Sequence, residues 1–252
     1  MKKFFLFLVA LALLIPSLAW ADEFQVAVAA NFEAPAKLIA AEFEKETGHK
    51  PILAFGSTGS FYTQIKNGSP VAIFLAADAK TPKQLETDGL IKPGSIFTYA
   101  QGALVLWSLT GGYVDAEGQV LKTGDYKHLA VANPKLAPYG AAAYELLGAW
   151  GILEGLENNK RLVIGENIAQ TYQYVKTASA ELGLVALSQV WKDGKFNEGS
   201  GWKVPADLYS PILQDVVILK TAENDAAVQA FSDYLKGEKA REIILSFGYV
   251  LN

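Results

Sequence analysis

Four short segments of the sequence carry residues suited to binding an anion. Each lies where an apolar run ends and a helix-like pattern begins, at residues 30–32, 56–60, 138–140 and 165–168. The start of a helix offers free backbone N–H groups and the positive end of the helix dipole, and both favour a bound anion. Ser57 and Thr58 add hydroxyl donors, and Asn31 is expected to be the N-cap of the helix that follows it. The segments therefore predict an anion site built from neutral donors.

Neutral donors can hold an anion without a cation if enough of them converge. A buried, unpaired dianion costs many kcal/mol, whereas each hydrogen bond to a charged group contributes about 1.5–3 kcal/mol and a helix start about 0.3–2 kcal/mol. The chain has only two arginines, Arg161 and Arg241, and neither lies in one of the four segments. A binder of organic carboxylates is expected to use an arginine. The sequence therefore favours a tetrahedral oxyanion.

Three carboxylates near these segments bear on the identity of the ligand. Glu33 and Glu166 are expected to face solvent, where they stabilise the helix starts, and either one pointing inward would argue against an anion. Asp78 is expected to cap a helix or to contact the hinge. Asp78 is also the candidate acceptor for the proton of a bound phosphate, because phosphate keeps a proton near neutral pH and its site benefits from an acceptor.

The elements that must position these segments alternate between apolar runs and amphipathic stretches. Continuous apolar runs predict strands buried on both faces, and apolar positions at helical spacing predict the helices. The strands are expected at 24–30, 51–55, 71–77, 102–109, 129–132, 162–164, 182–187 and 215–219, and the main helices at 33–46, 141–150, 169–176, 226–235 and 240–247. The fold class is α/β, with open, mostly parallel sheets and helices on both faces.

Two chain crossings, near residues 100 and 210, are expected to divide this series into two lobes. Residues 22–101 and 210–252 would form lobe I, and residues 102–209 would form lobe II. Two of the four segments then belong to each lobe. Because ligands of open α/β sheets bind beyond the carboxyl ends of the strands, we expect the site in a cleft between the lobes.

Residues 1–21 have the pattern of a cleaved signal peptide. Lys2 and Lys3 precede an apolar run, which ends at the small-residue site around Ala19 and Ala21. The leader takes two of the 22 basic residues and none of the 26 acidic ones, so the mature chain has a net charge of about −6. This balance argues against nucleic acid or an anionic membrane surface as a partner. The chain has no cysteine, so neither a disulfide nor a lipid anchor is expected, and an exported, periplasmic protein is predicted.

The sequence resembles the periplasmic molybdate-binding proteins of ABC transporters, which have the type II periplasmic binding protein fold. The resemblance covers nearly the whole mature chain, and its most specific parts are VAVAANF at 26–32, FGSTGSFYTQIKNG at 55–68, FLAAD at 74–78, ANPKLAPYG at 132–140 and LGLVALS at 182–188. It implies a monomeric solute-binding subunit that captures molybdate, and tungstate with it, for the permease subunits of an importer. It implies no cofactor, and molybdenum only as the bound oxyanion, without direct metal ligands.

The resemblance also implies which residues contact the oxyanion. In the first two segments these are Asn31 with Ala30 beside it, and Thr58 with Ser57 beside it. In the other two they are the backbone N–H groups of Tyr139 and Ile168. Some members of the family add a tyrosine hydroxyl at the position of Ala186, so this contact is missing here and selectivity over sulfate stays open.

Three other functions compete with this interpretation. The same scaffold can bind sulfate, phosphate or another small solute, or form the sensing domain of a regulator, although the leader and the lack of a DNA-binding segment argue against a regulator. A secreted hydrolase would need a histidine base, for which only His49 and His128 are available, and the chain has no G-x-S-x-G motif. No His, Cys or carboxylate cluster suggests a catalytic metal. We therefore predict a binding protein and not an enzyme.

Overall fold

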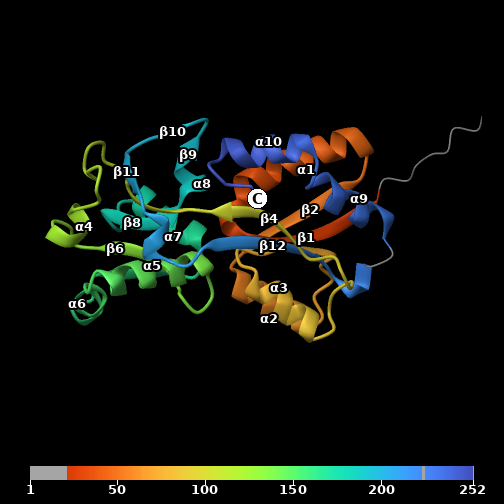
Figure 1. The fold of residues 1–252 in the computed structure, drawn as a ribbon, viewed down its shortest axis with the longest axis horizontal. Helices are drawn as coiled ribbons and strands as arrows, with labels where there is room; N and C mark the ends of the chain where they lie inside the picture. The colour runs from red at the N-terminus through yellow and green to blue at the C-terminus, as the bar shows by residue number, and fades with distance from the viewer. Residues whose placement is uncertain (1–21, 223–224, 252) are drawn as a thin grey trace, which may run out of the picture.

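The computed structural model describes residues 22–222 and 225–251, and it has two α/β lobes side by side (Figure 1). Each lobe is built on one five-stranded sheet. The first sheet has the order β2-β1-β3-β12-β4 and the second has the order β11-β5-β8-β6-β7. The predicted signal peptide, residues 1–21, lies outside the described residues.

The first lobe surrounds the sheet of β1 (Glu23–Ala29), β2 (Lys50–Gly56), β3 (Ile73–Leu75), β4 (Phe97–Gly102) and β12 (Ile212–Ile218). One face is covered by α1 (Glu33–Thr47), α9 (Ala226–Tyr234) and α10 (Glu238–Ser246), and the other by α2 (Thr58–Lys66) and α3 (Lys80–Thr87). Side chains of β1 alternate between the two faces, so Val26 and Val28 join one core while Ala27 joins the other. This double burial explains the continuous apolar runs in the sequence.

The second lobe surrounds β5 (Leu104–Ser108), β6 (Leu129–Ala132), β7 (Leu162–Gly165), β8 (Leu182–Ala186) and β11 (Ser200–Lys203). Helices α4 (Val120–Thr123), α5 (Pro138–Ala149) and α6 (Leu153–Asn158) belong to one face, and α7 (Ile168–Lys176) and α8 (Leu187–Val190) to the other. A small hairpin joins β9 (Trp191–Lys192) and β10 (Lys195–Phe196). Short 3₁₀ turns lie at η1 (Ala30–Phe32), η2 (Ala206–Leu208) and η3 (Lys220–Ala222).

The sheets are more mixed than the mostly parallel ones predicted. The pairs β1–β2, β1–β3, β6–β7 and β6–β8 are parallel, whereas β12 and β5 are antiparallel to both of their neighbours. The cause is the chain path, because β4 leads directly into β5 of the other sheet and β12 carries the chain back. The strands that enter a sheet from the other lobe, β5 and β12, therefore run in the direction opposite to that of their neighbours.

The predicted strands agree with the structure to within a few residues, and the one at 129–132 has the same bounds. The strand expected at 71–77 is shorter, covering Ile73–Leu75, and the edge strands β4 and β11 were not predicted. Within the described residues, no helix is long and apolar enough to cross a bilayer, and no group of His and acidic residues is arranged to hold a metal ion.

Candidate oxyanion-binding site

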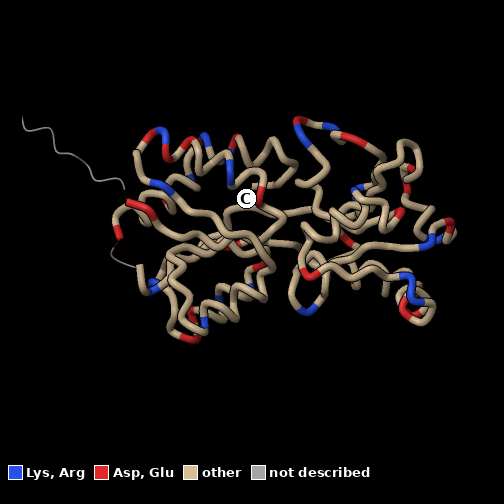
Figure 2. The backbone as a smooth tube through the Cα atoms, turned by 180° about the vertical axis from the view of Figure 1, so that it is seen from behind, with Lys and Arg blue, Asp and Glu red and all other residues tan. Residues whose placement is uncertain are grey.

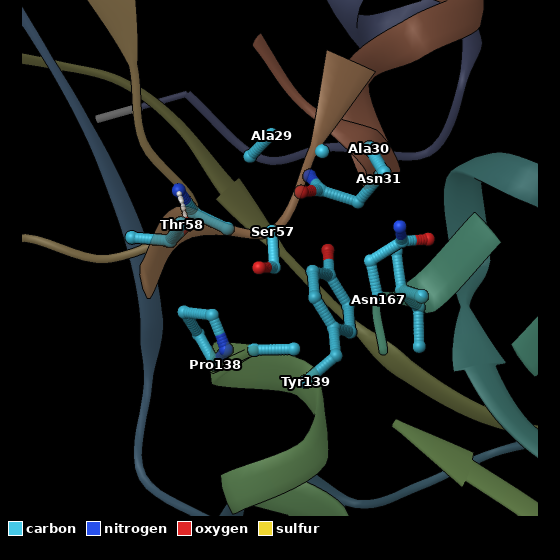
Figure 3. Close-up of a pocket in the computed structure, with 12 residues that line it drawn as sticks. Ala29, Ala30, Asn31, Ser57, Thr58, Pro138, Tyr139 and Asn167 are labelled. Carbon is cyan, nitrogen blue, oxygen red and sulfur yellow. Dashed lines mark hydrogen bonds between the residues drawn. The ribbon is translucent and has the colours of Figure 1, made fainter. Parts of the chain in front are cut away.

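A small cavity lies between the lobes, where the first turns of several helices meet (Figure 3). Its empty volume is about 200 Å³, part of which is open to solvent. All six residues predicted to bind the oxyanion line it, although they come from both lobes. These residues are Ala30, Asn31, Ser57, Thr58, Tyr139 and Ile168.

Six further lining residues were not predicted as site residues. They are Ala29, Gly56, Ala77, Ala137, Pro138 and Asn167. Five of them lie in the same four segments or directly beside them, and their place at a strand end or helix start could have indicated them. Ala77 comes from a fifth segment, which follows β3. None of the twelve lining residues is charged.

Helix α2 has its capping bonds arranged so that one N–H group is left for a ligand. Ser57 is the N-cap, and its Oγ accepts the N–H of Ser60 at 3.2 Å, while its carbonyl accepts the N–H of Phe61 at 3.1 Å. The N–H of Gly59 donates to the carbonyl of Leu136 at 2.9 Å. The N–H of Thr58 is therefore the first-turn donor of this helix that remains at the cavity.

Helices α5 and α7 repeat this arrangement. In α5, Pro138 has no N–H, and the carbonyl of Ala137 accepts the N–H groups of Gly140 and Ala141, which leaves the N–H of Tyr139. In α7, the side chain of Asn167 accepts the N–H of Gln170 at 3.0 Å, which leaves the N–H of Ile168 at the cavity wall. The two backbone donors expected from the sequence are thus placed toward the cavity, and their contact with a ligand stays a prediction.

The hydroxyl of Thr58 is held so that it can donate into the cavity. Its Oγ1 accepts the N–H of Ala77 at 3.0 Å, and the residue is only 2 % exposed. A hydroxyl that accepts from the protein keeps its own hydrogen for another acceptor. This bond also explains why the fifth segment, at Ala77, forms part of the wall.

We expect Thr58→Val to weaken oxyanion binding by about 1–3 kcal/mol, because it removes a buried donor and leaves the N–H of Ala77 without its acceptor. Valine keeps the shape of the side chain, so the cavity should keep its size. Titration calorimetry on the variant and the wild type measures the change. An unaltered affinity would place the ligand away from Thr58.

Asn31 was predicted to cap the first helix, and the structure shows that this is wrong. Its Nδ2 donates to Gln214 Oε1 at 2.8 Å and to the Tyr249 hydroxyl at 2.9 Å, so both amide hydrogens are used inside the protein. No side chain caps η1 or α1. The side chain was placed at a cap by its position in the sequence, but the buried partners on distant elements compete more strongly. The donor that Asn31 has left for a ligand is its backbone N–H.

Ser57 has two roles at the cavity. In the close-up, its Oγ points into the middle of the space between the two lobes (Figure 3). This Oγ also lies 2.6 Å from Ser60 Oγ, which in turn is 3.5 Å from a carboxylate oxygen of Glu166. The hydroxyl of Ser57 accepts the capping N–H of Ser60 and donates its own hydrogen to Ser60 Oγ, so Thr58 is the stronger candidate donor.

The carboxylates near the site lie outside the cavity wall. Glu33 forms an ion pair with Lys37 at 2.6 Å on the surface, as expected. Glu166 is exposed, and its carboxylate accepts a long hydrogen bond of 3.5 Å from Ser60 Oγ. Charged residues of both signs lie mainly on the outer helices and loops of the two lobes (Figure 2). The space that would receive the anion is lined by neutral groups alone.

Asp78 is a cap, in line with one of the two expectations for it. Its carboxylate accepts the N–H of Thr81 at 2.7 Å and the Thr81 hydroxyl at 3.1 Å. Burial raises the pKa of this carboxyl, and the hydrogen bonds from Thr81 act in the opposite direction. Since Asp78 does not line the cavity, its carboxylate is not placed to accept a proton from a ligand.

Direct hydrogen bonds join the lobes around the cavity. Gly59 N–H donates to the carbonyl of Leu136 at 2.9 Å, and Ser188 Oγ donates to the carbonyl of Asn31 at 2.8 Å. Gly59 has no side chain to obstruct this approach, since a Cβ there would lie 3.1 Å from Leu136 Cα. The structure is therefore a closed arrangement in which both half-sites face one another.

Ala186 leaves the position of the family's tyrosine without a hydroxyl, and a neighbouring glutamine uses the backbone there. Gln189 Oε1 accepts the N–H of Ala186 at 3.0 Å, and its Nε2 donates to the carbonyl of Ile168 at 3.0 Å. Ala186 is fully buried and does not line the cavity. The donor set therefore depends on the four helix starts.

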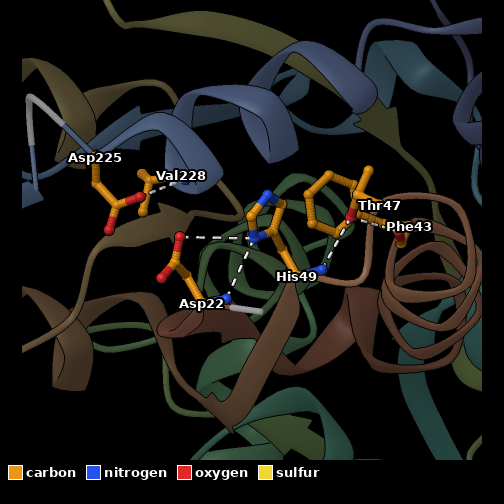
Figure 4. A network of polar contacts seen from close by, with 6 residues as sticks. All are labelled: Asp22, Phe43, Thr47, His49, Asp225 and Val228. Atoms are coloured by element: carbon orange, nitrogen blue, oxygen red, sulfur yellow. Dashed lines mark hydrogen bonds and ion pairs between the residues drawn. The ribbon is translucent and has the colours of Figure 1, made fainter. Parts of the chain in front are cut away.

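Neither histidine is placed to act as a base at the cavity. His49 lies near the start of β1, where its Nδ1 accepts the N–H of Asp22 at 3.2 Å and its own N–H donates to Thr47 Oγ1 (Figure 4). His128 is exposed and donates its backbone N–H to Glu181. Neither lines the cavity that holds Ser57 and Thr58.

Two α/β lobes that close over a small, uncharged, donor-lined cavity define a solute-binding protein for a small anion. The sequence profile of bacterial extracellular solute-binding proteins matches residues 24–250. The chain is 58% identical over 238 residues to the molybdate-binding protein ModA of Azotobacter vinelandii, with 94% of each chain covered. It is 52% identical over 233 residues to the ModA protein of Rhodobacter capsulatus, covering 92% of this chain and 90% of the relative.

The fold is also similar to that of a molybdate-binding protein. A solved structure of the Azotobacter vinelandii periplasmic molybdate-binding protein superposes with a TM-score of 0.88 and 40% identity, covering 91% of this chain and 99% of that one. The chain belongs to the family of bacterial extracellular solute-binding proteins. This confirms the predicted fold class and the prediction of a binding protein in place of an enzyme.

Proposed function

We propose that this protein is the periplasmic solute-binding subunit of an ABC importer and that it captures molybdate between its lobes. The relatives named for molybdate binding support the ligand. The observation that carries the proposal is the cavity of about 200 Å³, which is lined by Thr58, Tyr139 and Ile168 from the first turns of three helices and by no charged side chain. Tungstate has nearly the same size and charge, so we propose that it binds as well.

The neutral wall explains a preference for a fully deprotonated oxyanion. Every donor at the cavity needs an acceptor, and a tetrahedral dianion offers acceptors in all directions. A ligand that carries a proton would need a carboxylate to accept it, and Asp78 is committed to Thr81. Phosphate is therefore the weaker candidate near neutral pH. Sulfate is the closer competitor, and its smaller size should leave longer hydrogen bonds.

Asp78→Asn should leave the affinity for molybdate within about twofold of the wild type, because the residue is outside the cavity and asparagine keeps an acceptor for the Thr81 N–H. Titration of the variant with molybdate and with phosphate measures both affinities. A large loss of phosphate binding in the variant, from a measurable value in the wild type, would contradict this placement and reopen phosphate as the ligand.

We also propose that the ligand selects the closed form. Each lobe supplies two of the four helix starts, so an open protein would present two incomplete half-sites. A ligand that contacts both halves binds the closed form better and shifts the population toward it. The permease subunits would then recognise the closed surface. Small-angle scattering should show compaction when a verified ligand saturates the protein.

Calorimetric titration of the mature protein with molybdate tests the proposal, with tungstate, sulfate and phosphate in separate runs. We expect tight binding of molybdate and tungstate that excess sulfate does not displace. Binding of sulfate in preference to molybdate would still be consistent with a solute-binding protein but would contradict molybdate as its ligand. If none of the four oxyanions bound, the proposal of an anion site would be wrong.

A further inference from the structure

A buried side chain that does not touch the cavity connects its two halves. Gln214 lies in β12, the strand that carries the chain back from the second lobe, and it is fully buried. Its Oε1 accepts the Nδ2 of Asn31 at 2.8 Å, and its Nε2 donates to the hydroxyl of Tyr139 at 3.2 Å. Asn31 and Tyr139 belong to opposite walls of the cavity.

The backbones of these two residues are at the cavity, while their side chains are directed to Gln214. The side-chain amide of Asn31 has no hydrogen left for a ligand, because its Nδ2 donates to both Gln214 and Tyr249. Tyr139 is 1 % exposed, and its hydroxyl reaches past the site toward the strands that join the lobes. The side chains therefore act as anchors that fix where the two backbone N–H groups point.

The surroundings of Gln214 leave it little freedom. The Tyr99 hydroxyl lies 3.0 Å from its Oε1, and the pairing of β12 with β4 has a β-bulge between Gln214 and Asp215. Gly102 on the neighbouring strand leaves room for the contact, since a Cβ there would lie 2.0 Å from the Tyr139 hydroxyl and 2.6 Å from Gln214 Nε2. The amide of Gln214 is uncharged, and it both donates to one wall and accepts from the other.

The network around Gln214 carries no charge. Burial raises the pKa of the Tyr99, Tyr139 and Tyr249 hydroxyls well above its usual value, so all three are neutral. The next residue in β12, Asp215, has a carboxylate that accepts from Thr98 Oγ1 at 2.6 Å, and its N–H donates to the carbonyl of Asp78 at 3.4 Å. Behind an anion site, a neutral amide orients the donors without repelling the ligand.

We propose that Gln214 is a positioning residue for oxyanion binding, which holds the Asn31 and Tyr139 backbone donors in register across the two lobes. This inference depends on the proposed function. It makes Gln214 a determinant of affinity without any contact to the ligand. Because Gln214 sets the positions of the donors and is not itself a donor to the ligand, its loss should weaken the affinities for molybdate and for tungstate by the same factor.

Gln214→Met removes the donor and the acceptor and keeps the approximate volume. We expect its dissociation constant for molybdate to rise about tenfold or more, since buried partners in both walls lose their bonds. Tyr139→Phe removes only the hydroxyl and should give a similar loss. The double variant should be little worse than either single one, because both remove the same connection.

Tyr99→Phe is the matched control. It also removes a hydroxyl bonded to Gln214, but Tyr99 lies in β4 and bonds within the first lobe, to the carbonyl of Ala76 at 2.9 Å. It keeps the link between Asn31 and Tyr139, so its affinity should stay within about threefold of the wild type. If Tyr99→Phe weakened binding as much as Tyr139→Phe, Gln214 would be a general packing residue and the inference would be wrong.

Gln214→Glu adds a readout that loss of packing does not produce. A protonated carboxyl can still donate to Tyr139 and accept from Asn31, whereas an ionised one cannot donate and repels the anion. Burial and the nearby carboxylates raise the pKa of the introduced group. Affinity should therefore be close to that of the wild type at about pH 5 and more than about tenfold weaker at about pH 8, with little change in the wild type.

Thermal unfolding of each variant shows whether it is folded, and calorimetry gives its affinity. A wild type that binds no molybdate overturns the proposed function and the inference together. A wild type that binds, with a folded Gln214→Met variant of equal affinity or a Gln214→Glu variant of pH-independent affinity, overturns the inference alone.

Discussion

Replacing Ser57 with aspartate should abolish oxyanion binding while the protein stays folded. Aspartate is as good an N-cap as serine, so it should accept the Ser60 N–H and keep α2 in place. The same carboxylate would lie at the cavity wall, close to the bound anion. Two unit charges about 4 Å apart repel by about 4 kcal/mol at an effective dielectric constant of about 20, and a dianion doubles the charge on one side.

Loss of affinity by at least about a thousandfold is therefore expected for Ser57→Asp. The matched control is Ser57→Asn, which caps equally well and has nearly the same shape without the charge. Its affinity should stay within about tenfold of the wild type. Thermal unfolding with and without molybdate measures both variants, because a ligand that binds only the folded state raises the melting temperature. A Ser57→Asp protein that molybdate still stabilises would show that the ligand binds elsewhere.

The difference between these two variants isolates the role of charge. In a site with a cation, an added carboxylate could be neutralised by it. Here none of the lining residues is charged, and the ion pair between Glu33 and Lys37 at the start of α1 is on the surface. The donors are fixed dipoles that favour one anion and cannot adjust to two. A cavity lined only by neutral residues is therefore expected to lose much of its affinity for the anion when one negative charge is added.

The strands and helix starts of this fold were predictable because their signals are local. A strand that packs on both faces is apolar throughout, as in β6, and a serine before a helix is a cap wherever the helix lies, as Ser57 shows. The six residues predicted for the site could be proposed for the same reason, since each stands at a strand end or a helix start, and all six line the cavity. Local patterns also explain the prediction of Asn31 as a cap, which the structure contradicts.

What could not be predicted depends on residues that are far apart in the chain. The partners of the Asn31 side chain, Gln214 and Tyr249, are 183 and 218 positions away. The hydroxyl of Tyr139 meets Gln214 across 75 positions. Nothing in one sequence marks such pairs, because a buried glutamine in an apolar strand has no pattern of its own. The antiparallel direction of β5 and β12 is likewise a property of the chain path between the lobes.

Gly140→Ala should disrupt both stability and binding, because the added methyl group has no room. A Cβ at this position would lie 2.3 Å from the carbonyl oxygen of Ala132 and 2.8 Å from the carbonyl carbons of Ala132 and Asn133, all backbone atoms of β6 and the turn after it. Relief requires the first turn of α5 to move away from the sheet. We expect a loss of about 3 kcal/mol in the free energy of unfolding.

The same movement displaces the N–H of Tyr139, the residue before Gly140, so molybdate affinity should fall more than tenfold in the fraction that folds. Gly148→Ala is the control in the same helix, because a Cβ there meets nothing within 4 Å. Alanine at an open helix position should stabilise the protein by up to about 1 kcal/mol and leave binding unchanged. Urea unfolding and calorimetry on both variants test the pair. Equal behaviour of the two would mean that the close contact between α5 and β6 does not set the position of the Tyr139 donor.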